Sequence, residues 1–135
     1  MIVARQHKGA APPGEDVPPG LRARELCATT VLISAAGEID ACNAESVAGQ
    51  TEAGLAGYRQ LVLDLSAVTF FGTAGYAMLR RVDDHCRRRH LDWVVVPGRE
   101  AGRLLRICDP DGVIPTAENV VMAAAWLTRT EFHTA

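Results

Sequence analysis

The segment from Leu61 to Leu65 reads LVLDL, a nearly continuous run of apolar, strand-forming residues. Successive side chains of a strand point to opposite faces of the sheet, so a run of this kind has both faces buried. Burial on both faces is typical of parallel strands that are covered by helices. The run therefore predicts a sheet of the α/β class, with crossover helices between its parallel strands.

Other short segments have the composition of strands and turns. We expect strands over residues 22–27, 30–35, 93–96 and 113–114, with turns at residues 37–40 and 109–112. Pro97 and Gly98 close the third of these strands. Strand and helix patterns alternate along the chain, which predicts a mixed sheet of four or five strands packed with about four helices.

Helical periodicity separates these strands. A helix that begins near Thr73 places Gly75, Met78, Leu79, Val82 and Cys86 on one face. An earlier helix, with Asn43 as its N-cap, reaches about Ala56 and buries Ala44, Val47, Ala48 and Leu55. Two later helices display Ala101, Leu104, Leu105 and Cys108, and then, over residues 117–128, Val120, Val121, Ala124 and Leu127. The expected core includes Leu63, Leu65, Leu79, Val82, Val94 and Leu105.

Length and charge limit the remaining possibilities. The 135 residues suit one domain. Paired prolines predict a flexible leader over residues 1–20, followed by the domain over residues 21–135. The formal net charge is −2 and no apolar run is long enough to span a bilayer, so we expect neither nucleic acid nor membrane as a partner. Without a signal-peptide pattern, the expected location is the cytoplasm.

The sequence carries none of the common catalytic or nucleotide-binding motifs. The patterns G-x-S-x-G, G-x-x-x-x-G-K-[ST] and G-x-G-x-x-G are absent. His85, Cys86 and His90 lie in a helical stretch without a further ligand cluster, and Asp40 and Asp64 lie in different elements. We therefore expect no enzyme, metal or cofactor; a small enzyme or nucleotide-binding protein is the alternative from another class.

The four cysteines are Cys27, Cys42, Cys86 and Cys108. Their wide spacing fits neither a disulfide framework nor a zinc site. Free and mostly buried thiols are the simplest interpretation, and a regulatory disulfide is the alternative.

The segment Gly72-Thr73-Ala74-Gly75 opens a long amphipathic helix. Backbone N–H groups at a helix start favour negative charge, and the glycines allow a partner to approach closely. Thr73 is therefore placed where phosphorylation would change the local charge by about −1.5 to −2. Local physics alone favours the simpler interpretation, an ordinary Thr N-cap.

Several motifs in order resemble a known family. Gly37-Glu38-Ile39-Asp40, Leu61–Ser66 and Gly72–Gly75 together look like the STAS domain, and more narrowly the bacterial anti-sigma factor antagonists. The resemblance implies a small α/β fold that binds an anti-sigma factor, often a Ser/Thr kinase of the histidine-kinase-like ATPase class. In that family the kinase phosphorylates a D-[ST]-[ST]-G motif at the start of the second helix, which releases the antagonist.

The resemblance assigns the site residue by residue. The phosphoacceptor falls on Thr73, and the acidic position of the motif is occupied by Gly72. The implied partner surface comprises Asp40, Asn43, Gly72, Thr73, Ala74, Gly75 and Tyr76. Because the acidic residue is missing, we expect partner binding with slow or absent phosphorylation. The alternatives are constitutive antagonism, a phosphatase-insensitive switch, another kinase-like partner, or a STAS scaffold or regulator of stressosome-like or nucleotide-binding type.

Overall fold

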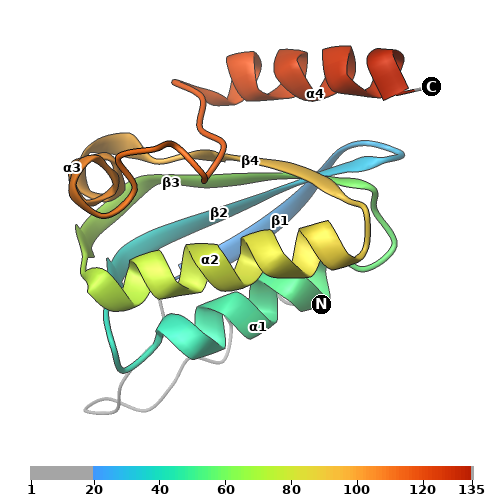
Figure 1. Cartoon of the computed structure of the whole chain (residues 1–135). Coiled ribbons are helices and arrows are strands. Elements are labelled where there is room, and N and C mark those ends of the chain that lie inside the picture. The colour runs from blue at the N-terminus through green and yellow to red at the C-terminus, as the bar shows by residue number, and fades with distance from the viewer. Residues whose placement is uncertain (1–19, 135) are drawn as a thin grey trace.

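The structure is a computed structural model that describes residues 20–134, with side chains described as far as Arg129. The predicted leader lies outside these residues, apart from Gly20. Within them the chain forms a four-stranded sheet and four helices (Figure 1). The strands are β1 (Gly20–Cys27), β2 (Thr30–Ile39), β3 (Gln60–Phe71) and β4 (Asp92–Val96). The helices are α1 (Ala44–Leu55), α2 (Thr73–Arg88), α3 (Gly98–Cys108) and α4 (Val120–Thr134).

The sheet is mixed, as the sequence predicts, with the order β1-β2-β3-β4. β1 pairs with β2 as an antiparallel hairpin, whereas β2 with β3 and β3 with β4 are parallel pairs. Each parallel pair needs a crossover, and α1 and α2 supply these connections. The run from Leu61 to Leu65 lies in the interior strand β3, where helices cover both faces.

Alternate residues of the sheet feed two separate cores. In β3, Leu61, Leu63 and Leu65 belong to the main cluster, which also contains buried side chains of α1, α2 and α3. Val62 points to the opposite face and packs with Val94, under Ala123 and Leu127 of α4. All six predicted core residues are buried, but Val94 lies in this second cluster rather than in the main one.

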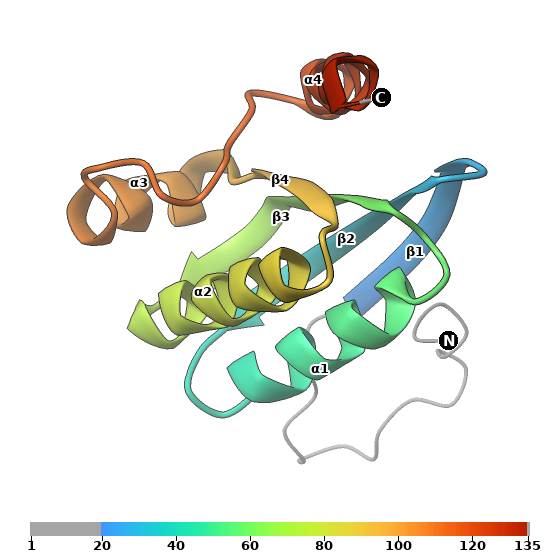
Figure 2. The same ribbon diagram turned by 45° about the vertical axis from the view of Figure 1, so that its right-hand side comes forward.

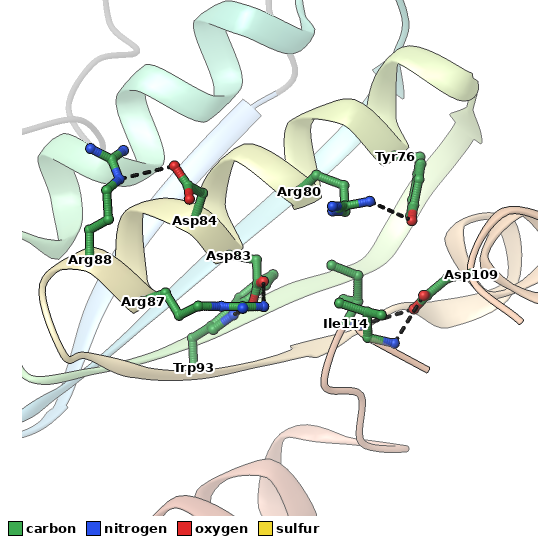
Figure 3. Close-up of polar contacts among 10 residues, drawn as sticks. Tyr76, Arg80, Asp83, Asp84, Arg87, Arg88, Trp93, Asp109 and Ile114 are labelled. Atoms are coloured by element: carbon green, nitrogen blue, oxygen red, sulfur yellow. Dashed lines mark hydrogen bonds and ion pairs between the residues drawn. The ribbon is translucent and has the colours of Figure 1, made fainter. Parts of the chain in front are cut away.

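Polar contacts link α2 to its neighbours, while its predicted apolar face, Gly75 to Cys86, is buried. The carboxylate of Asp83 accepts hydrogen bonds from Trp93 Nε1 of β4 at 2.9 Å and from Arg87 Nη2 at 2.8 Å (Figure 3). Arg81 donates from Nε and Nη2 to both oxygens of Glu52 in α1, at 2.8 and 3.0 Å. This fork holds the pKa of Glu52 below its ordinary value.

α3 packs against the carboxyl-terminal part of β3. It begins at Gly98, which has a φ of 71°, and a Cβ built there would lie 2.6 Å from Cα of Ser66. Glycine is therefore required by both the backbone conformation and the close approach of the strand. Ala101 and Leu105 are buried as predicted, and Leu104 and Cys108 are half-buried.

α4 covers the face of the sheet opposite α1 and α2 (Figures 1 and 2). A buried amide connects it to the sheet: Gln60 Nε2 donates to the carbonyl oxygen of Leu127 at 3.1 Å, and Gln60 Oε1 accepts from Thr30 Oγ1 at 2.7 Å. The buried polar atoms of Gln60 are thereby satisfied, and the helix is held over β3 and β4.

Two expectations about β structure are wrong. Residues 37–39 continue β2 instead of turning, because parallel pairing with β3 extends as far as Ile39 opposite Phe71, with Gly37 at a φ of 99° beside a bulge. Val113 and Ile114 form no strand, since their amides donate to the carboxylate of Asp109, both at 2.9 Å. Thr116 instead forms a single bridge with Val95.

The last helix also differs from its prediction. It begins at Val120 rather than near Ala117, because the side chain of Asn119 caps it by accepting from Met122 N at 2.8 Å. It extends to Thr134 instead of ending around Thr128. Its sheet-facing side is centred on Ala123 and Leu127, whereas Val121, predicted to face inward, is 77% exposed.

The first prediction concerns the main core. Leu63 is fully buried, so we expect Leu63→Ala to lower the free energy of unfolding by about 2–5 kcal/mol, through lost burial and a residual cavity. Ile107, which is 73% exposed, provides the control: Ile107→Ala should change stability by less than about 0.5 kcal/mol. Urea denaturation of both variants measures the difference. An unchanged midpoint for Leu63→Ala would show that this strand is assigned to the wrong environment.

Candidate functional site

The parallel pairing of β2 and β3 brings two connections together at one edge of the sheet. Ile39 at the end of β2 is opposite Phe71 at the end of β3. Gly72 N then donates to the carbonyl oxygen of Ile39 at 3.1 Å, which joins the segment after β3 to the end of β2. The loop at residues 40–43 and the start of α2 are consequently neighbours (Figure 1). The expected surface residues Asp40 and Asn43 and those from Gly72 to Tyr76 therefore come from adjoining connections.

Hydrogen bonds of its own side chains shape the loop at residues 40–43. Asp40 Oδ1 accepts from Cys42 N at 2.9 Å, and Asn43 Oδ1 accepts from Asp40 N at 3.0 Å. Asn43 Nδ2 also donates to the carbonyl oxygen of Glu38 at 2.9 Å. Asn43 occupies the N-cap position of α1 as expected, but its side chain bonds backward to β2 and the loop rather than to the helix. Asp40 and Asn43 thus fix the shape of the loop.

Thr73 is the first residue of α2, and Gly72 is its N-cap. The interpretation of Thr73 as an ordinary N-cap is therefore wrong. Gly72 has an extended backbone with φ −90°, a conformation open to any residue. The side chain of Thr73 is exposed, and its hydroxyl makes no hydrogen bond within the described residues. The hydroxyl is thus accessible at the positive end of a 16-residue helix.

Because Gly75 has no side chain, the start of α2 packs closely against Phe71 of β3. A Cβ at this position would lie 2.6 Å from Cε1 and Cζ of Phe71, closer than real Cβ contacts allow. Ala74 and Tyr76 are half-buried and pack against the main core. The helix start is therefore held from below by packing, while Thr73 is presented to solvent.

Two residues at this edge were not anticipated. Phe70 is 50% exposed, and a Cβ at Gly72 would lie 3.2 Å from its ring, so the ring borders the site. Arg80 Nη1 donates to Tyr76 Oη at 3.3 Å, near the loop that Asp109 organises (Figure 3). The four-residue spacing of Tyr76 and Arg80 on an exposed helix could have indicated their contact. The exposure of Phe70 had no comparable signal, because it depends on the sheet register.

The carboxylates of Asp40 and Asp64 lie far apart in the structure. The carboxylate of Asp64 accepts from the amide and hydroxyl of Ser66. Asp64 lies opposite Ser34 of β2, whereas Asp40 follows the end of β2, six residues after Ser34. Strand geometry places such positions about 20 Å apart. Among the described residues, no three His, Cys, Asp or Glu side chains are grouped to hold a metal ion. Within residues 20–134, no helix combines the length and the hydropathy that spanning a bilayer requires.

All four cysteines are free, but the expectation that most are buried is wrong. Cys86 is buried in α2, which raises the pKa of its thiol to about 12. Cys27 and Cys42 are exposed because they lie in a hairpin and in a loop, and Cys108 is half-buried. Hydrogen bonding from Thr29 and Thr30 lowers the pKa of Cys27 to about 7.

Comparison with known proteins identifies similar sequences and folds. The model of the STAS domain family matches residues 22–123. The anti-sigma-F factor antagonist RsfA of Mycobacterium tuberculosis is 30% identical over 102 residues, which cover 70% of this chain and 80% of that protein. Osmosensory protein A of the same species is 38% identical over 69 residues, or 51% of this chain, and the chain spans only 42% of its length.

A solved structure supports the fold. The crystal structure of an anti-sigma factor antagonist from Mycobacterium paratuberculosis superimposes with a TM-score of 0.67. The match covers 78% of this chain and 90% of that protein, at 23% sequence identity. The mixed sheet with its flanking helices is therefore an arrangement that a distant sequence also adopts.

The second prediction tests the packing of Gly75 in α2 against the Phe71 ring. Because its added methyl group would collide with the Phe71 ring, Gly75→Ala should lower stability by about 1–3 kcal/mol. The matched control is Gly102→Ala in α3, where a Cβ meets nothing within 4 Å and where alanine should stabilise the helix by about 0.5–1 kcal/mol. Thermal and urea denaturation measure both variants. Equal responses would rule out the proposed packing of Gly75.

Proposed function

The chain belongs to the STAS domain family, among the anti-sigma factor antagonists, and we propose that it binds an anti-sigma factor and thereby frees a sigma factor for transcription. It acts in this proposal as a binding protein of the cytoplasm and not as an enzyme. Support comes from the similarity to an anti-sigma-F factor antagonist over most of both chains.

The observation that carries the proposal is the joined edge at the ends of β2 and β3. The hydrogen bond from Gly72 to Ile39 makes the 40–43 loop and the start of α2 one surface. Thr73 is exposed at its centre, and Gly72 and Ala74 add little side-chain bulk. A partner can therefore approach the backbone closely and meet the hydroxyl directly.

We propose that the partner is a Ser/Thr kinase of the histidine-kinase-like ATPase class and that Thr73 is its acceptor. Three features support this assignment: exposure, a hydroxyl without an intramolecular bond, and a position at the positive end of α2. A phosphate there would be accommodated by the free chain, because helix N-termini favour anions. Its charge would oppose docking, since a dry interface cannot solvate it.

The third prediction tests this surface. Thr73→Glu should weaken binding to the cognate anti-sigma factor by at least about tenfold, or 1.4 kcal/mol, because a charge is buried at the contact. The control is Ala28→Glu, which adds the same charge in the exposed β1–β2 hairpin at the opposite end of β2. Isothermal titration calorimetry measures both affinities. Tight binding by Thr73→Glu would refute the charge switch.

The fourth prediction concerns the residue before the acceptor. We expect the wild type to be a poor kinase substrate, because Gly72 supplies no carboxylate to orient the Thr73 hydroxyl or the kinase. Gly72→Asp should raise phosphorylation at Thr73. The extended backbone accepts the substitution, and the half-exposed Phe70 ring, 3.2 Å from the new Cβ, has room to shift.

Intact-mass spectrometry after incubation with the partner kinase and ATP measures this effect. Gly72→Asn is the control, since asparagine caps the helix as well as aspartate does but brings no charge. Equal gains from both substitutions would assign the effect to helix capping. Rapid, stoichiometric phosphorylation of the wild type would contradict the prediction, and modification of another residue would overturn Thr73 as the acceptor.

A further inference from the structure

α1 and α2 lie side by side on one face of the sheet (Figures 1 and 2). Within residues 20–129, the side-chain hydrogen bonds and ion pairs that join these two helices all end on one carboxylate, that of Glu52 in α1. Arg81 of α2 donates to both of its oxygens, at 2.8 and 3.0 Å. His85, four residues later in α2, has its Nδ1 4.0 Å from Glu52 Oε2. One carboxylate therefore faces two basic side chains.

His85 differs from Arg81 because an imidazole gains or loses its charge close to neutral pH. The side chain of His85 is only 14% exposed, and that of Glu52 only 20%. A charge that is held away from water needs a partner to compensate for the lost hydration. The nearest carboxylate already receives two hydrogen bonds from the guanidinium of Arg81. A proton on His85 would therefore have to share a partner that is in use.

The charged groups around the imidazole oppose protonation on balance. They are the carboxylate of Glu52 from α1 and, from α2, the guanidiniums of Arg81, Arg88 and Arg89. Burial is the largest cause that lowers the pKa of His85 below its ordinary value of 6.5, and the three guanidiniums act in the same direction. Glu52 opposes them without reversing the result.

We propose that His85 makes the contact between α1 and α2 sensitive to acid: the helices pack with the imidazole neutral, and a proton on it loosens them. The unfolded chain binds this proton more tightly than the folded chain, so acid favours unfolding. The stability that comes from neutral His85 is fully present above pH 6.5 and is lost as the pH falls below that value. Glu52 acts in a separate range, because its lowered pKa withdraws stability only below its ordinary value of 4.5.

The candidate surface is attached to both of these helices. α1 follows the 40–43 loop directly, and α2 begins at Thr73. Loosening one helix from the other would therefore weaken the support of the two connections that form the surface. The acid sensitivity goes beyond the proposed function and does not depend on the partner, so it is measured on the chain alone.

Urea denaturation of the full chain tests the proposal. We expect the midpoint of the wild type to fall as the pH is lowered from about 7.5 to about 5.5, a range above the titration of ordinary carboxylates. His85→Gln should remove most of this fall, because glutamine stays neutral. His90→Asn is the matched control and should keep the fall: His90 is exposed beyond the end of α2, and asparagine accepts its φ of 58°. Circular dichroism verifies that both variants fold.

NMR titration of the imidazole protons of the wild type measures the same effect without a variant, and we expect a midpoint for His85 below the ordinary value of 6.5. Arg81→Gln should raise this midpoint, because Glu52 is then free to pair with the protonated imidazole. A midpoint at or above 6.5, no change in Arg81→Gln, or an undiminished fall of the urea midpoint in His85→Gln would each overturn the proposal. The proposed function is measured separately at neutral pH, through Thr73→Glu, so either can fail without the other.

Discussion

The parallel pairing of β2 with β3 is the interaction on which the rest of the structure depends. It extends from Thr30 opposite Gln60 to Ile39 opposite Phe71. Parallel strands cannot be joined by a tight turn, so α1 must cross over the sheet, and its apolar face is buried in doing so. Because both strands run in the same direction, their carboxyl ends coincide, and the two following connections meet there.

At the candidate site the backbone is held in place by the sheet, while the side chain of Thr73 remains accessible. Phe71 beneath Gly75 and the bond between Gly72 and Ile39 fix the backbone from below. Thr73, one position from the cap, makes no contact that would hold its hydroxyl inward. In the proposed complex this preorganised backbone would lose little conformational entropy on binding, while phosphorylation of Thr73 would change the charge of the contact.

The two faces of the sheet are covered by different helices and hold cores of different size. One face, under α1, α2 and α3, holds the larger core and supports the proposed antagonist surface. Within residues 20–134, α4 is the helix that covers the other face, through a small cluster and the hydrogen bonds of Gln60.

The local sequence pattern determined two kinds of element: strands buried on both faces over several residues, and helices buried along one face. The apolar run Leu61–Leu65 predicted an interior strand, and the periodic face from Gly75 to Cys86 predicted a buried helix face, because these arrangements remove those side chains from water. The order of motifs around Gly72 also indicated the family. Tertiary structure decided residues 37–39, which stay in β2 because β3, distant in the chain, offers parallel hydrogen bonds. Side-chain hydrogen bonds over four or five residues decided two other details, which the periodicity of the sequence does not reveal: Asn43 bonds to Glu38 instead of its helix, and the amides of Val113 and Ile114 bond to Asp109 instead of a strand. In each case the local preference amounts to about 1 kcal/mol, which hydrogen bonds of about 0.5–1.5 kcal/mol each can offset.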